Sequence, residues 1–289
     1  SPQQDASQLL YEAARVLRVS PSEIRALRIA RRSVDARKKP DVKLIYTVDV
    51  ALKSGEGKAL KKCGSKRVCS APGEYYHPPK FRPAGKTRPV VIGFGPAGMF
   101  AALILAMAGQ HPLVLERGED ALSRHRKVET FFETGDLDPR SNVQFGEGGA
   151  GTFSDGKLNT GVNNPRIHWI LEQFVSFGAR EEILYDAKPH VGTDVLLTVV
   201  QNLRGRVQAL GGEVRFNSQV TEFLLDGGNL VGLRLQTGEE IPCTQAVLAI
   251  GHSARDTFET LLSQGVPMEP KPFAMGVRIE QRQEYINFS

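Results

Sequence analysis

Three glycines at fixed spacing are the clearest chemical signal in this chain. The segment Pro89–Ala102 is an apolar run followed by G-x-G-x-x-G, with glycines at Gly93, Gly95 and Gly98. Gly93 permits a tight turn, Gly95 lets the backbone approach a pyrophosphate, and Gly98 lets a helix pack on a strand. The helix that follows would direct its unpaired N–H groups and positive dipole end toward the phosphates.

An acidic residue follows at the distance that a dinucleotide site requires. A second apolar run, Pro112–Leu115, leads directly into Glu116, which lies 18 positions after Gly98. A carboxylate at the end of the second strand can accept hydrogen bonds from ribose hydroxyls. The strand, glycine turn, helix, strand and acid together predict a β–α–β unit that binds a dinucleotide.

A second glycine-rich segment runs from position 146 to position 156. Its eleven positions hold five glycines and two hydroxyl side chains, namely Gly146, Gly148, Gly149, Gly151, Gly156, Thr152 and Ser154. Such a segment brings many backbone N–H groups close to an anion or an oxygen-rich ring, and Lys157 adds a cation at its end. Phe145 and Phe153 are expected to anchor it to a core, which argues against a flexible surface loop.

The end of a later apolar run supplies a further candidate. Ala246–Ile250 is nearly all apolar, which predicts a strand that is buried on both faces. Gly251 and His252 follow its carboxyl end, where ligands bind in open α/β sheets. His252 is a candidate for proton transfer because the pKa of histidine suits it. A structural hydrogen bond is the alternative role of this side chain.

Periodicity and turn residues predict the elements that position these groups. Residues 6–19 favour a helix, 20–29 a short second helix, and 42–50 a strand. We predict a small basic α+β domain at 1–70, followed by a Pro/Gly-rich linker at 71–88. A Rossmann-type FAD-binding domain comes next in two parts, at 89–164 and 211–258, and an inserted helical or substrate-domain part at 165–210 separates them. Residues 259–289 are the truncated start of a substrate domain. The second part contains a three-strand meander, and residues 273–279 are expected to form a last strand. The fold class is therefore α/β, with three layers and a parallel sheet.

Composition and charge narrow the class of protein. The chain has 289 residues, 40% of them hydrophobic and 24% charged, which is ordinary for a globular protein, and no apolar stretch has the roughly 18–20 residues of a membrane span. Three cysteines without metal-ligand spacing favour a reducing compartment, so we expect a cytoplasmic protein without a metal. Residues 1–88 hold 20 Lys and Arg against 8 Asp and Glu, whereas the remainder is mildly acidic. We expect the basic face to dock on its acidic neighbour; nucleic acid is a less favoured partner because no stacking aromatic motif accompanies the charge.

Several long stretches resemble a family of uncharacterised bacterial FAD-dependent dehydrogenases or oxidoreductases, which belongs with the glutathione-reductase-like flavoproteins. They are G-F-G-P-A-G at 93–98, E-R-G at 116–118, N-V-Q-F-G-E-G-G-A-G-T-F-S-D-G-K-L at 142–158, P-H-V-G-T-D at 189–194, A-I-G-H-S-A-R-D-T-F at 249–258 and K-P-F-A-M-G-V-R-I-E at 271–280. The resemblance runs from about residue 8 to the end of the chain.

The resemblance implies a set of residues that bind FAD. It comprises Gly93, Gly95, Pro96, Ala97 and Gly98 at the pyrophosphate, Glu116 at the adenosine ribose with Arg117 beside it, the backbone of Val220 at the adenine, Gly149, Ala150, Gly151, Thr152, Phe153 and Ser154 at the flavin, and Gly251 where the chain returns to the cofactor. Members of this family continue well beyond residue 289. We therefore expect a truncated form with an incomplete flavin pocket, weak FAD binding and little or no turnover.

The leading hypothesis is an FAD-dependent oxidoreductase that exchanges a hydride between flavin N5 and an unknown small organic substrate. Lys157 and His252 are the candidate catalytic residues, and an unidentified electron donor or acceptor would complete the reaction. An NAD-dependent dehydrogenase is the first alternative, but it needs neither the second glycine segment nor the meander. The other alternative is a flavin-binding protein whose basic N-terminal part binds RNA or a protein partner.

Overall fold

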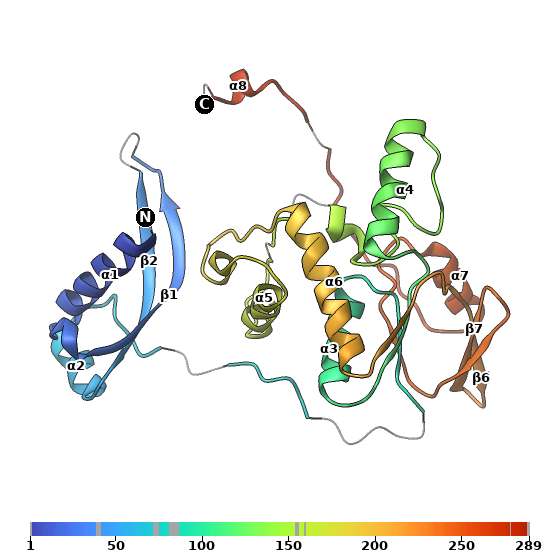
Figure 1. Ribbon diagram of the computed structural model, residues 1–289, viewed down its shortest axis with the longest axis horizontal. Helices are drawn as coiled ribbons and strands as arrows, with labels where there is room; N and C mark the ends of the chain where they lie inside the picture. The colour runs from blue at the N-terminus through green and yellow to red at the C-terminus, as the bar shows by residue number, and fades with distance from the viewer. Residues whose placement is uncertain are drawn as a thin grey trace. The chain divides into compact units, whose positions relative to one another are not determined.

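The computed structural model describes residues 2–38, 42–71, 75–80, 87–153, 156–158, 160–277 and 279–287. The chain divides into two compact units, Ser1–Ser253 and Ala254–Ser289 (Figure 1). The first unit contains the three sheets of the described residues: a two-stranded, a four-stranded and a three-stranded sheet.

The four-stranded sheet is parallel and has the order β5-β4-β3-β9. Its strands are β3 (Val90–Ile92), β4 (Leu113–Leu115), β5 (Glu213–Arg215) and β9 (Ala246–Leu248). β3 and β4 are central and fully buried, and helix α3 (Pro96–Met107) connects them. This strand–helix–strand unit confirms the β–α–β arrangement predicted from the sequence.

The two central strands bury their side chains in two different layers. Val91 and Val114 face a cluster that contains α3 and α6 (Thr193–Ala209), which lie side by side (Figure 1). Val90, Ile92 and their neighbours face the meander cluster on the opposite side of the sheet. Because successive side chains of a strand point to opposite faces, the apolar runs of these strands serve both layers. The predicted three-layer arrangement is confirmed.

The meander is antiparallel and has the order β6-β7-β8, with strands β6 (Val220–Asp226), β7 (Asn229–Leu235) and β8 (Glu240–Pro242). Turns at Gly227-Gly228 and Gly238 join its strands, and the glycines have positive φ. Leu233, Leu235 and Ile241 bury their side chains against the parallel sheet. The predicted meander is therefore confirmed.

The prediction that the strand at 246–250 is buried on both faces was wrong. β9 covers only Ala246–Leu248, and Val247 and Leu248 are 39% and 43% exposed. The reason is topological, because β9 is the edge strand of the sheet and pairs only with β3. A nearly continuous apolar run does not distinguish an edge strand from a central one.

Three further helices of the first unit follow β4 along the chain. They are α4 (Ala121–Thr134), α5 (Arg166–Ser176) and the short 3-10 helix η3 (Glu181–Leu184). Asp120 caps α4 by accepting hydrogen bonds from the backbone N–H groups of Leu122 and Ser123, at 3.1 and 3.3 Å. This cap fixes the start of α4 beside the carboxyl end of β4.

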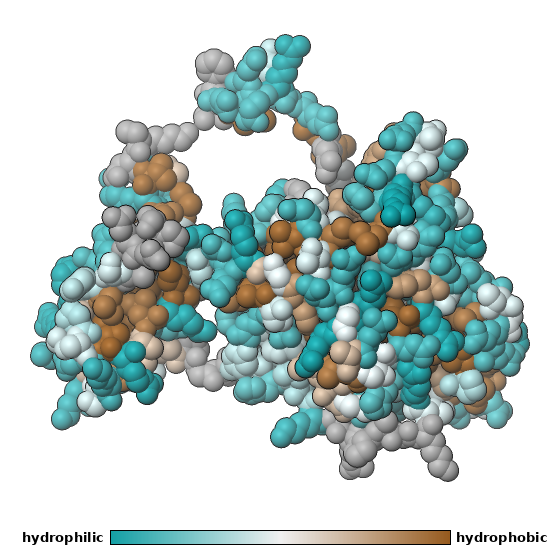
Figure 2. All heavy atoms as spheres, in the orientation of Figure 1, coloured by the Kyte–Doolittle hydropathy of each residue, from teal (hydrophilic) through white to brown (hydrophobic). Residues whose placement is uncertain are grey.

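The N-terminal segment folds around the antiparallel hairpin β1 (Ile24–Asp35) and β2 (Lys43–Leu52). Helices α1 (Pro2–Leu17) and α2 (Glu56–Cys63) accompany it, and Ala13, Ala14 and Ala59 bury themselves in one small apolar cluster with hairpin residues. Exposed apolar side chains also gather on the hairpin (Figure 2), namely Val34, Val42, Leu44 and Ile45.

The predicted second helix at 20–29 was wrong. Ser20 does start a helical turn with a capping box, but η1 covers only Pro21–Glu23, and β1 begins at Ile24. These residues form a strand because they pair with β2, and β-branched and arginine side chains are compatible with a strand when a partner strand is present. Local periodicity could not reveal that partner.

The open edge of β1 contacts the segment that precedes His190. Arg32 donates from its backbone N–H to the Tyr185 carbonyl at 2.7 Å, and Ala187 donates back to the Arg32 carbonyl at 2.9 Å. The Arg32 guanidinium also binds the Asp186 carboxylate at 2.7 and 3.1 Å. A basic side chain of residues 1–88 thus pairs with an acidic side chain of the remainder.

The second unit contains α7 (Arg255–Ser263) and the short α8 (Gln283–Asn287). We predicted a strand at 273–279, but the residues of this range that the structure describes, 273–277 and 279, form no strand. Phe273, Met275 and Val277 alternate as in a strand, but each is more than 80% exposed and none pairs with a neighbouring strand. No helix of the described residues is long and apolar enough to cross a bilayer.

Candidate dinucleotide-binding site

The amino end of α3 is the centre of the candidate site. Gly95 is the N-cap residue and Pro96 the first helical residue, which suits a proline because it has no N–H to leave unpaired. Gly98 lies so close to the Gly93 carbonyl that a Cβ would collide with it. This close approach explains why the third glycine of the motif is needed for the turn itself. Pro96 and Ala97 are exposed at this end of the helix.

The second glycine segment lies directly on the first. Gly148 donates its backbone N–H to the Phe94 carbonyl at 2.9 Å. Gly149 begins the 3-10 helix η2 (Gly149–Phe153), and a Cβ on it would lie 3.1 Å from the Gly95 Cα and from the Pro96 Cδ. Its φ of +61° is also one that a side chain disfavours. Two segments far apart in sequence therefore form one backbone surface at the α3 amino end.

Glu116 ties together the segments around this surface. It is 4% exposed, and its carboxylate accepts three backbone hydrogen bonds, from Phe94 at 2.6 Å, Gly118 at 2.9 Å and Gly146 at 3.0 Å. A carboxylate has about four acceptor positions, so one is left for a ribose hydroxyl. The residue predicted to bind ribose therefore also has a structural role that the sequence did not reveal.

The segments that carry Val220 and Arg117 adjoin Glu116 and the second glycine segment through other contacts. Ser218 donates to the Glu116 carbonyl at 2.8 Å, which places the start of β6 and its buried first residue, Val220, beside the end of β4. The Arg117 guanidinium lies 4.5 Å from the centre of the Phe145 ring, in a cation–π contact. Arg117 therefore helps to hold the second glycine segment.

Arg124 organises that segment from within α4. Its side chain is fully buried and donates to the carbonyls of Asn142 at 2.7 Å, Val143 at 2.7 Å and Glu147 at 2.6 Å. Burial lowers the pKa of Arg124 to about 10, which leaves it charged at neutral pH. Its guanidinium carbon also lies 4.6 Å from the centre of the Phe153 ring.

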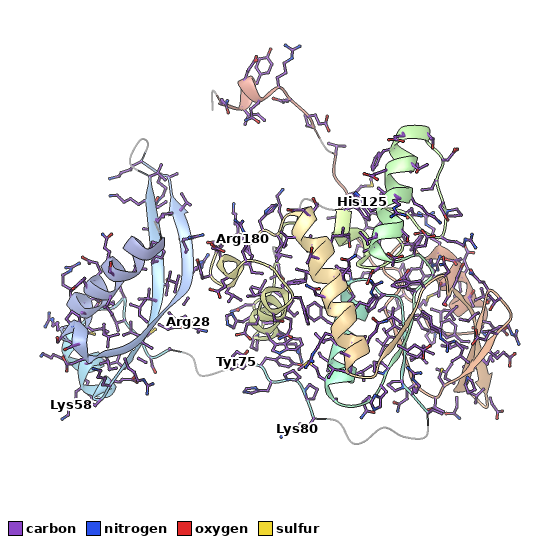
Figure 3. The ribbon with its side chains drawn as sticks, viewed as in Figure 1. Arg28, Lys58, Tyr75, Lys80, His125 and Arg180 are labelled. Carbon is purple, nitrogen blue, oxygen red and sulfur yellow. The ribbon has the colours of Figure 1, made fainter. Side chains whose placement is uncertain are left out.

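Phe153 closes the segment onto α4. Besides Arg124, its ring stacks with His125, with ring centres 5.9 Å apart. Figure 3 labels His125 at α4. Thr152 is buried and donates its hydroxyl to the Glu147 carbonyl at 3.4 Å. Ala150 and Gly151 are exposed, whereas Ser154, predicted to contact the flavin, lies outside the described residues. Phe145 and Phe153 pack on Arg117, Arg124 and His125, and neither ring belongs to a hydrophobic core cluster of the described residues, so the predicted anchoring to a core was wrong.

Glu147 is the second buried acid of this region. It is fully buried, its Oε2 accepts from the Ala121 backbone N–H at 2.7 Å, and the Arg204 guanidinium of α6 lies 3.3 Å away. Its Oε1 has no hydrogen-bond partner in the part of the chain that the structure describes. Burial raises the pKa of Glu147 to about 7.

The candidate catalytic residues lie on separate segments. Lys157 is exposed after the glycine segment and forms a backbone bridge with His190. Gly251 and His252 are exposed after β9, and the Ser253 hydroxyl lies 3.3 Å from the His252 Nε2. The turn at Ala249 contacts the first motif, because a Cβ on Gly93 would come 2.5 Å from the Ala249 carbonyl oxygen. The described residues contain no cluster of three His, Cys, Asp or Glu side chains that could hold a metal.

Sequence reasoning missed Arg124, Glu147 and Arg204. One signal was available, because Ala121, Arg124 and Val128 share the spacing of the buried face of α4, which predicts a buried arginine. No comparable signal exists for Glu147, because its burial depends on α4 and α6 meeting the glycine segment.

One family model and one relative match parts of this chain or nearly all of it. Residues 1–51 match the family model of a domain of unknown function, DUF8436. An uncharacterized protein of Clostridium beijerinckii is 45% identical over 287 residues, which is 98% of this chain and 53% of that protein. The chain thus spans about half the length of this relative.

Solved structures share part of the arrangement at low identity. The structure of Thermovibrio ammonificans THI4 is similar at 17% identity with a TM-score of 0.42, covering 63% of this chain and 64% of that one. A glycine oxidase from Bacillus cereus is similar at 13% identity with a TM-score of 0.40, covering 63% of this chain and 60% of that one.

Proposed function

We propose that this chain binds FAD at the carboxyl edge of its parallel sheet, as the nucleotide-binding part of an FAD-dependent oxidoreductase. The contact between Gly149 and Gly95 carries the proposal. It gives the α3 amino end a surface of bare backbone, and a pyrophosphate needs such a surface to approach the helix N–H groups.

The residues around this surface fit the rest of such a cofactor. Glu116 has an acceptor position left for a ribose hydroxyl, and Val220 follows a segment bound to the Glu116 backbone. The exposed Ala150 and Gly151 leave room at the flavin side, and Arg117 supports this segment through Phe145. FAD, when bound, supplies hydride exchange with a small organic substrate, while the protein binds and orients it.

The meander favours FAD over the nicotinamide alternative. In a doubly wound nicotinamide domain, helices cover both faces of the parallel sheet. Here the helices α3 and α6 cover one face, and the meander residues Leu233 and Ile241 pack on the other. For the same reason, an NAD-dependent dehydrogenase fits this chain less well.

Lys157 and His252 are the proposed catalytic residues. Lys157 would act as a cation near the cofactor, and His252 would carry a proton.

A substitution at Gly95 tests this proposal with little risk to the fold. Gly95 has φ −76° and ψ −175°, which alanine adopts readily, and a Cβ would lie 3.7 Å from the Gly149 Cα, an ordinary contact. Gly95→Ala should therefore fold normally but lose FAD affinity by at least about tenfold, equivalent to about 1.4 kcal/mol. Gly205→Ala is the matched control, because Gly205 is exposed in α6 and a Cβ there meets nothing within 4 Å.

The experiment is a fluorescence titration of the purified chain with FAD and, separately, with NAD⁺. FAD binding that Gly95→Ala weakens and Gly205→Ala preserves supports the proposal. Binding of NAD⁺ in preference to FAD would replace it with the dehydrogenase alternative. Equal FAD affinity in all three proteins would place the pyrophosphate elsewhere and refute the site.

A further inference from the structure

Glu147 is a buried acid that the proposed cofactor contacts do not use. Its carboxylate lies between three elements, namely the glycine segment that carries it, the start of α4 at Ala121, and Arg204 of α6. Oε2 has the Ala121 N–H and the Arg204 guanidinium, but Oε1 is without a partner among the described residues and has no access to solvent. A buried carboxylate oxygen without a donor is costly, and the cost falls when the group is protonated.

The charged groups around Glu147 partly oppose one another. Arg204 approaches from α6 and favours the ionised form, whereas Asp120 at the α4 N-cap and Glu116 after β4 oppose it. Arg124 is buried nearby and also attracts the Glu147 charge, while its guanidinium binds the backbone carbonyl of Glu147 at 2.6 Å. The largest influence is burial, which raises the pKa of Glu147 to about 7. The carboxyl therefore changes its protonation state close to neutral pH.

Glu147 is directly continuous with the dinucleotide-binding surface. The next residue, Gly148, donates to the Phe94 carbonyl at 2.9 Å, and Gly149 packs on Gly95. The backbone of Glu147 is held on both sides, because its N–H donates to the Glu119 carbonyl at 3.0 Å and its carbonyl accepts from Arg124 at 2.6 Å. A shift of this backbone would therefore also move the adjoining Gly148 and Gly149.

We propose that Glu147 is a positioning residue that links dinucleotide binding to one proton. The protonated carboxyl keeps Gly148 on Phe94 and Gly149 on Gly95, and loss of the proton loosens both contacts. Binding at higher pH then takes one proton from solvent onto Glu147, and no other group changes. The ligand in this inference is the one given by the proposed function. The effect of Glu147 on the glycine segment does not depend on the proposed function.

The first test is FAD titration at pH 6, 7 and 8 with the wild-type chain, Glu147→Gln and Glu129→Gln. A single site with a pKa of about 7 that stays protonated in the complex weakens binding about tenfold between pH 6 and pH 8. Glu147→Gln should bind with the same affinity at all three values. Glu129→Gln removes an exposed carboxylate of α4 and should keep the wild-type dependence. Identical pH profiles for the wild type and Glu147→Gln would overturn the proposal.

A second variant, Arg204→Gln, tests the proposal even if Glu147→Gln does not fold. Arg204→Gln removes the cation that favours ionised Glu147, so the pH midpoint of binding should move upward. A midpoint that does not move, or that moves downward, contradicts the proposal.

Hydrogen exchange of residues 146–153 separates this inference from the proposed function. In the ligand-free chain, after correction for intrinsic rates, the wild type should exchange faster than Glu147→Gln at pH 8 and at the same rate at pH 6. If FAD does not bind at any pH, the proposed function fails, while this comparison still tests Glu147. Equal exchange in both proteins at both pH values overturns the role of Glu147.

Discussion

The backbone of Gly149 rests on that of Gly95, so closely that a Cβ at position 149 would come 3.1 Å from the Gly95 Cα. The N-cap residue of α3 and the first residue of η2 thus share one contact surface. A change in either segment alters the amino end of α3, which makes the two glycine motifs one structural feature.

Gly149→Ala should destabilise the chain before any ligand is added. Alanine at φ +61° costs about 1–2 kcal/mol, and its Cβ would also press on Gly95. Chemical denaturation should show a loss of this size. Gly161→Ala is the control, since a Cβ there meets nothing within 4 Å. Equal stability of both variants would mean that the two glycine segments do not touch as described.

Glu116→Gln should weaken the unliganded fold as well as FAD binding. The carboxylate accepts three backbone N–H groups, and a glutamine must turn its NH₂ toward at least one of these donors. Hydrogen bonds to a charged group are worth about 1.5–3 kcal/mol each, so we expect a loss of at least that order on denaturation. A variant with lower FAD affinity but wild-type stability would show that Glu116 acts only on the ribose.

The pH dependence of stability should differ between the wild type and Glu147→Gln. Burial raises the folded-state pKa from the ordinary value of 4.5 to about 7, so between these values the folded chain binds more protons than the unfolded one. The free energy of unfolding therefore falls as pH rises from about 4.5 to 7, by about 3 kcal/mol from this group. Thermal melts of both proteins at pH 5 and pH 7.5 isolate the contribution of Glu147. The prediction fails if their difference in stability is constant with pH.

Lys157→Met should lower the midpoint potential of bound flavin. A cation near the ring favours the reduced, anionic cofactor, and Lys157 lies exposed at the end of the glycine segment. A spectroscopic redox titration of both proteins measures the shift. An unchanged potential would assign Lys157 to the backbone bridge with His190 instead.

Arg32→Ala should loosen the contact between the hairpin and the segment around Asp186. The side chains of the bidentate ion pair are 31% and 30% exposed, so its removal should cost no more than about 1 kcal/mol of stability. Hydrogen exchange at residues 185–187 should nevertheless accelerate, because the Arg32 backbone pairs with them. Arg31→Ala changes the exposed neighbouring residue and serves as the control. Exchange that is equally slow in both variants would contradict this docking role.

The elements of the proposed dinucleotide site could be predicted because their signals are local. The glycine spacing at 93–98 fixes a turn and a helix start, and the apolar runs at 90–92 and 113–115 are short enough to be strands. The meander followed from alternation and from glycine turns at Gly227 and Gly238. Each of these features depends on residues close together in the chain.

The errors concern features that depend on distant partners. Ile24–Ile29 became a strand because β2 pairs with it, and β9 is exposed because it lies at a sheet edge. The structural role of Glu116 required knowing that Gly146 returns to it from 30 positions away. Burial of Glu147 likewise depends on Arg204 and Ala121, which no local pattern connects.

Arg124 has a consequence for the order in which this region assembles. The carbonyls of Asn142, Val143 and Glu147 all accept hydrogen bonds from this one guanidinium, and all three residues lie outside any helix or strand. The bonds that hold this shape require Arg124 to lie beside the segment, where α4 places it. On unfolding, the loss of α4 removes all three bonds at once, so α4 and the glycine segment open together as one cooperative unit.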